Sequence, residues 1–411
     1  MSNPDRNSRK STVLVFAMLL AIALAGYFTI LNNSLVSDDY FYVNYTSAMP
    51  VSELWRIFTM MLLVLRPVPI FVWWVQSQLF GGEGLPSYLI DVGLHAGVAW
   101  GLFLLMSRLG CARRTAILSA VLFVLAPVGP DAVTWSSGRM DTMALLYVLT
   151  ALFLYLAFLK QKNRYAYAGS LLAATAALLS KEEALVLVIL MPTMEALFGG
   201  GEPFAPGFIA GRLGRSSTNR LVIGALRQIP FFLTFLGYFI LRWALLGGVG
   251  GYESVIGIPN PRMTARSLWT FLSPLNNEIF SKGTIVFFGL ITALFWAIST
   301  FLVVYHWRHT SLTLRRLWLL FAVFLAVARL PVFSFFFVVG LNHSMLDSRF
   351  FSFPTLPFVA MTALGLLEFC GKSGFWGTVL QVLLVLGALM CLWALHGNTR
   401  LWEHASDATS I

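Results

Sequence analysis

Charged residues are scarce in this chain. Only 11% of its 411 residues are charged, whereas 58% are hydrophobic, and the mean hydropathy is +0.78. In a typical soluble domain about 25% of the residues are charged. The shortage of charge therefore excludes a water-soluble protein and indicates one that lies within a membrane.

Paired cysteines and nucleotide-binding loops are also lacking. The three cysteines, Cys111, Cys370 and Cys391, have no paired spacing, which excludes a disulfide framework and a cysteine metal site. The glycine-rich run at 247–251 directly follows an apolar segment, so it predicts a flexible loop and not a phosphate-binding turn. Because no cluster has metal-ligand spacing, we expect neither a metal nor another cofactor.

Long apolar runs dominate what is present. Each is roughly long enough to cross about 30 Å of hydrocarbon as a helix, and their continuity rules against the alternating pattern of a membrane barrel. The sequence therefore predicts an all-α polytopic membrane protein with about 11 transmembrane helices. The predicted spans are Thr12 to Asn33, Ser87 to Ser107, Thr115 to Pro130, Met140 to Leu159, Tyr165 to Leu179, Ala184 to Phe198, Ile229 to Leu246, Gly283 to Tyr305, Leu317 to Val339, Phe351 to Phe369 and Phe375 to Leu395.

Basic residues predict the orientation. With a cytoplasmic N-terminus, the inner segments collect roughly 17 Lys and Arg residues and the outer ones about 9. The asymmetry accounts for the net charge of +10, which is therefore not a nucleic-acid signal. This orientation places the long loop after the first span outside.

The prediction is a single membrane-embedded domain over residues 1–411. Residues 34–86 form the first outer loop, and residues 199–228, rich in Gly, Pro and Arg, form a cytoplasmic connector. Apolar residues from Val51 to Leu65 recur at helical spacing, so we expect a helix in the membrane interface that covers a cavity. A second apolar stretch, Ile70 to Phe80, suits the same interface.

The pair Asp38-Asp39, directly after the first span, is the most informative polar feature. A single loop acid is usually just solvated, but carboxylates at membrane depth need partners or a polar cavity. Several outer loops contribute both acids and cations, so we expect a hydrated site that opens outward. These loops are Asp131 to Asp141, Ser180 to Glu183 and Asn342 to Arg349.

At these residues the chain resembles the GT-C superfamily of integral-membrane glycosyltransferases, whose members carry an acidic motif in the first outer loop. It is most similar to the membrane part of the transmembrane-and-TPR protein O-mannosyltransferases and their bacterial relatives. The resemblance covers most of the chain and depends on the order and spacing of its pieces. They are Asp38-Asp39-Tyr40, Arg66-Pro67-Val68, Asp91 to His95, Phe123 to Asp141, Leu179 to Glu182 and Asp347 to Pro354.

The sequence also departs from that family's pattern. Relatives often have His-Pro ahead of the acidic residue, where this chain has Ala126-Pro127, and the late motif reads Arg349-Phe350-Phe351 where tyrosines are more usual. No TPR array follows the last predicted span. Because such an array is a natural place to hold a polypeptide, its absence favours a glycan or lipid acceptor over a protein.

The resemblance implies an inverting glycosyltransferase that moves a monosaccharide from a polyprenyl-phosphate carrier to a hydroxyl of a glycan, lipid or protein at the outer membrane face. The acceptor hydroxyl needs a general base, for which we choose Asp38, with Asp39 second. A departing phosphate needs cations, and a guanidinium offers it two parallel hydrogen bonds. The candidate cations are Arg66, Arg139, Lys181 and Arg349. For each of them an ordinary ion pair or lipid-headgroup contact is the alternative.

The other candidates would hold the sugar or the acceptor through hydrogen bonds or aromatic stacking. They are His95, Asp131, Trp135, Asp141 and Glu182. A histidine within a span is more often a packing residue than a functional one. Asp91 lies one helical turn before His95 and shares its face.

A transporter or flippase of lipid-linked saccharides is the alternative from another class. Transport needs ionisable groups or broken helices near mid-membrane and often repeated halves, whereas here the polar groups crowd one side. The high proportion of Arg relative to Lys favours a bacterial inner membrane, with the site facing the periplasm or exterior. The relatives suggest mannose, and arabinose-type or other hexose donors stay open.

Overall fold

The computed structural model describes residues 4–59, 64–199, 217–248, 261–333, 341–345, 348–369 and 375–409. Within these ranges the chain consists of helices and loops and contains no β-strand, which confirms the all-α prediction. Each predicted span contains a helix. These helices are α1 (Pro4–Gly26), α4 (Gly84–Arg108), α5 (Arg113–Leu125), α7 (Arg139–Gln161), α8 (Arg164–Leu178), α9 (Leu187–Phe198), α11 (Ser217–Leu246), α13 (Lys282–His306), α14 (Leu312–Phe333), α15 (Ser352–Leu364) and α16 (Phe375–Thr409).

Six helical segments in the described ranges are long and apolar enough to cross a membrane by length and composition. They lie in α4, α7, α11, α13, α15 and α16 and in the residues that extend them, and α1 contains a shorter apolar helix, Ser11–Gly26. The chain is therefore an integral membrane protein. The exact count of eleven spans stays a prediction.

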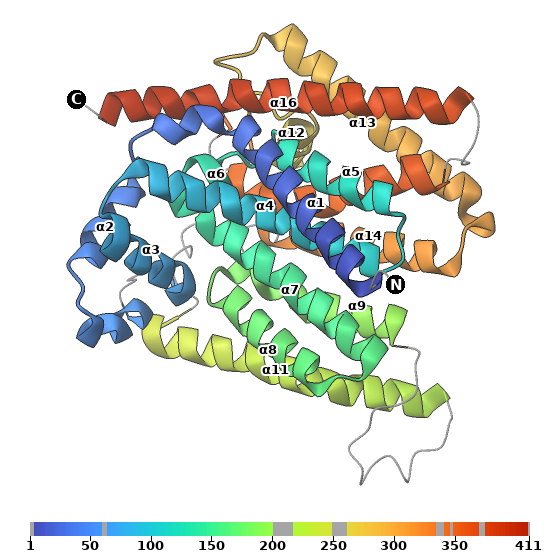
Figure 1. Cartoon of the computed structure of the whole chain (residues 1–411), viewed down its shortest axis with the longest axis horizontal. Coiled ribbons are helices and arrows are strands. Elements are labelled where there is room, and N and C mark those ends of the chain that lie inside the picture. Colours follow the sequence, from blue (N-terminus) through green and yellow to red (C-terminus); the bar gives the residue numbers. More distant parts are fainter. Residues whose placement is uncertain are drawn as a thin grey trace.

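Helices α4, α11 and α16 run roughly along the long axis of the molecule, and α1 and α13 cross them obliquely (Figure 1). The C-terminal end of α16 lies at the same end of the molecule as α2 (Asp38–Ser47) and α3 (Pro67–Phe80), on the left of the view, whereas the N-terminus lies toward the other end. A hydrogen bond agrees with this placement, because the Ser34 N–H donates to the Ser406 hydroxyl at 2.7 Å. The loop after the first span and the C-terminal end of the last helix therefore lie at the same end of the molecule. An odd number of spans gives this arrangement.

Small residues let the central helices approach one another. Ala99 of α4, Ala144 and Ala151 of α7 and Ala174 of α8 are completely buried. In a bilayer, where lipid is as apolar as Leu, such close packing and polar contacts hold helices together. These alanines let α4, α7 and α8 pack closely within a core that also contains many large apolar side chains.

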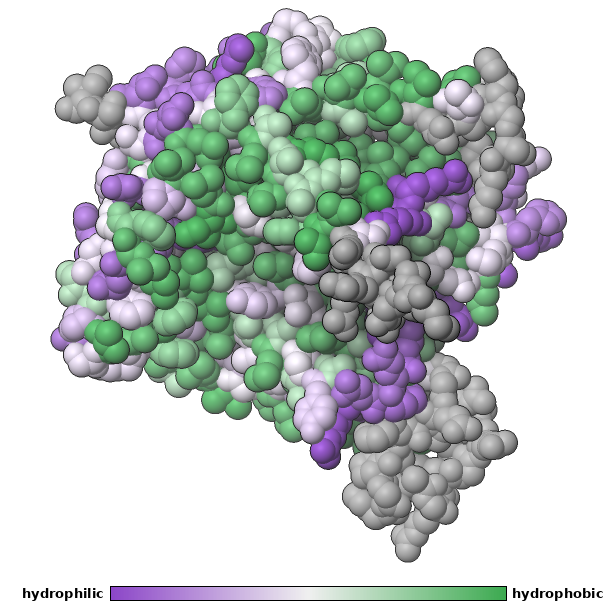
Figure 2. Space-filling view, in the orientation of Figure 1, coloured by the Kyte–Doolittle hydropathy of each residue, from purple (hydrophilic) through white to green (hydrophobic). Residues whose placement is uncertain are grey.

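A broad apolar surface faces outward. On α11 the side chains of Phe232, Leu236 and Trp243 are exposed, while Phe231 and Phe235 on the other side are buried. Figure 2 shows apolar residues over a wide band of the visible face, with hydrophilic residues gathered toward its left edge and at the right and lower right. Lipid is the solvent that makes such exposure stable.

The structure adds detail to three expectations about loops. The apolar stretch from Val51 forms a 3-10 helix only over Val51–Phe58, and residues 60–63 lie outside the described part. The second stretch is α3, which begins at Pro67 because proline suits the first helical turn; its Trp73 is fully buried and does not lie at the lipid interface. The predicted connector is helical from Ser217 onward, as the start of α11, and residues 200–216 lie outside the described ranges.

Candidate active site

Several short elements converge at the end of the molecule that holds α2 and α3. Between α5 and α7 the chain forms α6 (Asp131–Thr134) and then a 3-10 turn (Ser136–Gly138). A Cβ atom at Gly138 would lie 2.3 Å from the carbonyl oxygen of Asp131, so this tight turn requires glycine. We call residues 131–138 the third-loop turn.

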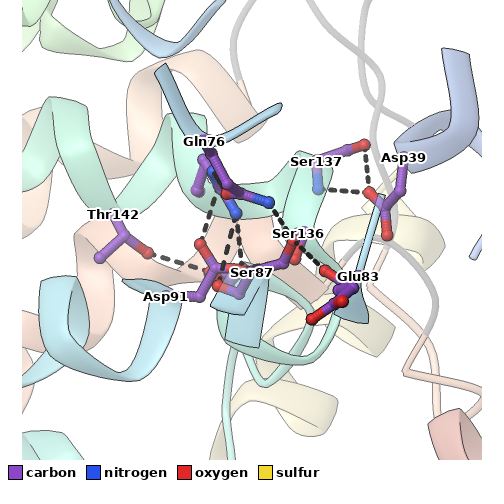
Figure 3. Close-up of polar contacts among 10 residues, drawn as sticks. Asp39, Gln76, Glu83, Ser87, Asp91, Ser136, Ser137 and Thr142 are labelled. Atoms are coloured by element: carbon purple, nitrogen blue, oxygen red, sulfur yellow. Dashed lines mark hydrogen bonds and ion pairs between the residues drawn. The ribbon is translucent and has the colours of Figure 1, made fainter. Parts of the chain in front are cut away.

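The two adjacent aspartates have opposite environments. Asp38 and Asp39 open α2, where successive side chains point about 100° apart. Asp38 is exposed, whereas Asp39 is completely buried. The Oδ1 atom of Asp39 accepts the Ser137 N–H at 2.7 Å and the Ser137 hydroxyl at 2.5 Å (Figure 3). The Oδ2 atom accepts the Val36 N–H at 3.2 Å. Asp39 therefore joins the first outer loop to the third-loop turn.

Burial governs the acidity of Asp39. It raises the pKa of the carboxyl to about 6, although the hydrogen bonds from Ser137 and Val36 and the charge of Arg139 favour the ionised form. The group is consequently ionised at neutral pH and becomes protonated in mild acid.

Arg139 lies at the centre of a buried network. Its Nε is 2.9 Å from Asp91 Oδ1, its Nη1 donates to Gln76 Oε1 at 2.7 Å, and its guanidinium lies 4.1 Å from the ring centre of Trp73. Asp91 also accepts the Ser136 hydroxyl at 2.6 Å (Figure 3). Since Arg139 is completely buried, it holds α3, α4 and the third-loop turn together.

A second charged cluster lies beside α3 and α7. Arg66 forms a two-pronged pair with Glu182, at 2.6 Å from Nη2 and 3.3 Å from Nε, and Arg242 of α11 is 3.9 Å from the same carboxylate. Lys181 pairs with Asp141 and lies 3.5 Å from Glu183. This cluster brings together four segments of the chain with three cations and three acids.

The acids of that cluster titrate differently. Burial works against the ionised form of Glu182, but the charge and hydrogen bonds of Arg66 outweigh it and hold the pKa at about 2. Burial raises the pKa of Glu183 well above its usual value, and the nearby Asp141 raises it further, against the charge of Lys181. The pKa values of these two adjacent carboxyls therefore shift in opposite directions.

A third group links the third-loop turn to the late motif and the last helix. Asp131 accepts the Ser348 N–H at 2.9 Å and the Trp402 indole N–H at 3.2 Å. Arg349 is half-buried, with its guanidinium 4.1 Å from the ring centre of Trp135. Burial raises the pKa of Asp131 to about 7, opposed by the hydrogen bonds from Ser348 and Trp402 and by the charge of Arg349. Asp347 of the same motif lies outside the described residues.

His95 occupies a packing position. It is buried, stacks on Phe123 at 4.9 Å, meets Tyr27 edge to face at 5.6 Å and has Nε2 3.4 Å from the Val124 carbonyl oxygen. Its neighbour Asp91 bonds Ser136 and Arg139 instead. A sugar contact by His95 stays a prediction.

The structure brings the predicted residues together in three groups. Asp39 lies with the Arg139 network, Arg66 and Glu182 lie with Lys181 and Asp141, and Asp131 and Trp135 lie with Arg349. The second and third groups approach each other at Phe350, whose ring centre is 4.3 Å from Lys181 Nζ and 5.2 Å from the Arg349 guanidinium. No three His, Cys, Asp or Glu side chains gather as metal ligands in the described ranges, and the expectation of no metal stays a prediction.

Sequence reasoning missed several contributors. Gln76, with Gln78, is one of two amides in a largely apolar stretch, which is a usable signal for a buried polar role. Arg242 lies within the predicted span Ile229 to Leu246, where an arginine calls for a partner. Trp402 gave no signal, because its partner Asp131 is 271 positions away in the sequence.

An apolar cavity of about 120 Å³ lies next to the third group. It is lined by α5, α12 (Pro261–Leu272), α13, α15 and α16, with Phe271, Phe288 and Phe358 among its walls. Pro127 and Pro274 at its border accept hydrogen bonds from Asn398, one helical turn before Trp402. The cavity therefore lies along the middle of α16, at Leu384 to Met390, and extends to the Pro127 and Pro274 segments that Asn398 binds.

The fold is shared with a solved glycosyltransferase. The crystal structure of the Archaeoglobus fulgidus oligosaccharyltransferase in the apo form matches with a TM-score of 0.53 and 13% identity, over 94% of this chain and 56% of that one. The likeness shows that the two chains share a fold, and this chain spans little more than half the length of the archaeal enzyme. ArnT from Cupriavidus metallidurans bound to undecaprenyl phosphate matches at 0.42 and 15% identity, over 95% of this chain and 77% of ArnT, a likeness too weak to carry an argument. No protein-family model and no curated protein sequence matches the chain.

Proposed function

We propose that this chain is an inverting glycosyltransferase that moves a monosaccharide from a polyprenyl-phosphate carrier to a hydroxyl acceptor at the outer membrane face. The observation that carries the proposal is the difference between two adjacent acids. Asp39 is buried and accepts hydrogen bonds from Ser137 and Val36, whereas Asp38 is exposed on the first turn of the same helix. A rigidly anchored acid thus holds an accessible one in place, and the shared GT-C fold supports the reading.

Asp38 acts as the general base. It takes the proton of the acceptor hydroxyl while the hydroxyl oxygen attacks the anomeric carbon. The bond from that carbon to the phosphate oxygen breaks, and the polyprenyl phosphate leaves with the electron pair. Attack opposite the phosphate inverts the configuration, so one base suffices. Asp38 then releases its proton to solvent.

Arg349 is the principal ligand of the donor phosphate. It is half-buried and held over Trp135, and a guanidinium suits the two oxygens of a phosphate. Lys181 is buried and paired with Asp141, so we assign it to holding the site in shape beside Phe350. Arg66 and Arg139 are bonded to Glu182 and Asp91, so we assign them to holding the site in shape. Trp135 and Asp141 remain proposed neighbours of the sugar.

The carrier lipid has a place beside this phosphate site. The apolar cavity bordered by Pro127 and Pro274 suits part of an isoprenoid chain, because its walls are almost wholly apolar. A chain seated there would bring its phosphate near the late motif and α16. We also propose that the acceptor is a glycan or a lipid and that the site faces the periplasm.

The test follows sugar release from undecaprenyl-phosphate-linked mannose, glucose and arabinose by purified protein in nanodiscs. Asp38→Asn should lower turnover by about 10² to 10⁴-fold, the usual contribution of a general base. Glu53→Gln is the matched control, because Glu53 is an exposed acid of the same loop paired only with the exposed Arg56. Normal turnover by a folded Asp38→Asn variant would remove Asp38 as the base.

A further inference from the structure

The outer end of α16 is joined to two other segments. The Trp402 indole N–H donates to Asp131 Oδ1 at 3.2 Å, and Asp131 Oδ2 accepts the Ser348 N–H at 2.9 Å. Both Asp131 and Ser348 are buried, at 2% and 0% exposure. Charge-assisted hydrogen bonds of this kind, shielded from water, fix geometry strongly.

The same three segments close a ring of contacts. Arg349 follows Ser348 directly and lies 4.1 Å from the Trp135 ring centre. Trp135 in turn stacks on Trp402 with ring centres 5.9 Å apart and planes 22° apart. The ring therefore runs from Trp402 through Asp131, Ser348, Arg349 and Trp135 back to Trp402.

Trp402 is not an ordinary membrane-interface tryptophan. Interface tryptophans place the ring among lipid headgroups, and Trp393 on the same helix is exposed, with one edge contact to Phe280. The Trp402 N–H instead donates to the buried carboxylate of Asp131, and the Trp402 ring stacks on Trp135. These contacts lie within the protein and serve its outer site.

The rest of α16 fixes the helix without help from Trp402. Asn398 donates to the carbonyl oxygens of Pro127 at 3.0 Å and Pro274 at 2.7 Å. Ser406, one turn beyond Trp402, accepts the Ser34 N–H at 2.7 Å. A change at position 402 therefore leaves the helix anchored on both sides and alters mainly the ring of contacts.

We propose that Trp402 is a positioning residue for the donor phosphate: its bond to Asp131 and its stacking on Trp135 hold the Arg349 guanidinium in one orientation. The proposal rests on the function proposed above, in which Arg349 binds that phosphate. Arginine loses much side-chain freedom when it binds a ligand, so fixing it beforehand raises affinity without adding a contact.

The experiment compares Trp402→Phe, which keeps a stacking ring and loses the N–H, with Trp402→Ala, which loses both. Trp393→Phe on the same helix is the matched control. With the same panel of undecaprenyl-phosphate sugars, we expect Trp402→Phe to raise the donor KM about fivefold to tenfold, the equivalent of one hydrogen bond. Trp402→Ala should raise it further, while kcat and the KM of the acceptor stay close to those of the wild type.

A double-mutant comparison with Arg349 tests whether Trp402 positions the guanidinium or has only a structural role. In an Arg349→Ala background, Trp402→Phe should raise the donor KM no further, because the side chain that it orients is gone. Equal effects of Trp402→Phe with and without Arg349 would overturn the proposal. So would a wild-type donor KM in Trp402→Phe while Arg349→Ala is impaired.

A pH profile gives an independent readout. The carboxyl of Asp131 faces the Arg349 guanidinium, the Trp402 N–H and the Tyr27 phenol. Removing the Trp402 N–H disfavours the ionised form, so the acid limb of donor kcat/KM should move to higher pH in Trp402→Phe. An unmoved acid limb counts against the proposal. Wild-type protein that neither binds nor turns over any polyprenyl-phosphate sugar would instead refute the proposed function itself.

Discussion

Ser137 donates both its backbone N–H and its hydroxyl to one oxygen of Asp39, at 2.7 and 2.5 Å. The two residues are 98 positions apart in the sequence, and their contact fixes the first turn of α2 against the third-loop turn. Asp38 shares that turn. The position of the exposed acid is therefore set by its buried neighbour.

The buried state of Asp39 predicts a pH-dependent stability. Its pKa rises from 3.8 to about 6 on burial, so the folded chain binds this proton more tightly than the unfolded chain. The stabilisation is complete below about pH 4 and is lost as the pH rises through 6. This stabilisation of the folded chain amounts to roughly 3 kcal/mol at most.

Asp39→Asn has no such proton to lose. Between pH 4 and 7, the Tm of the wild type should therefore fall relative to the Tm of Asp39→Asn, measured by thermal unfolding in detergent. Parallel Tm curves for the two proteins would show that Asp39 does not titrate in this range.

The pair of Arg139 and Asp91 predicts strong coupling. Arg139→Gln leaves the buried carboxylate of Asp91 without its cation, which costs about 3 to 5 kcal/mol. Adding Asp91→Asn removes the unpaired charge and should restore part of that loss in a double-mutant cycle. The exposed pair of Arg56 and Glu53 is the control, and breaking it should cost about 0 to 1 kcal/mol. Additive losses for the buried pair would contradict this arrangement.

The third-loop turn predicts a backbone effect on catalysis. A methyl group at Gly138 would meet the Asp131 carbonyl oxygen at 2.3 Å, so Gly138→Ala must displace the turn that carries Ser137 and Trp135. We expect at least a tenfold loss of turnover, because small displacements of a catalytic group are costly. Gly93→Ala, where the added atom meets nothing within 4 Å, should retain the activity of the wild type in the same assay.

The last prediction concerns metals. The acids of the site are engaged with cations or with N–H and O–H donors, and a monophosphate carrier needs less neutralising charge than a nucleotide diphosphate. Treatment with EDTA followed by gel filtration should therefore leave turnover unchanged. A loss that Mg²⁺ or Mn²⁺ restores would show that a cation takes part.

Apolar run length predicted where the helices lie, because spanning a bilayer demands continuous hydrophobic stretches whatever the neighbours are. The boundaries were less predictable. The 3-10 helix at Val51–Phe58 and the early start of α11 at Ser217 depend on packing and local turns, which leave only weak traces in hydrophobicity.

The residue types of the candidate site were also visible in the sequence, since acids and arginines in a chain with so little charge stand out. Which acid pairs with which cation was not visible in the sequence. Lys181 pairs with Asp141 at a separation of 40 positions, and Arg66 pairs with Glu182 at 116. Pairing of this kind depends on how the helices are arranged, and a single sequence does not record it.

By itself, the sequence determined that this protein is an all-α membrane protein with acids and cations gathered at the ends of its helices, because water and lipid impose that pattern locally. Only the tertiary structure decided that Asp39 is buried while Asp38 stays exposed, and that Trp402 joins the site. Both outcomes depend on contacts between segments far apart in the chain, such as Ser137 with Asp39 and Asp131 with Trp402, and these exist only once the helices have packed.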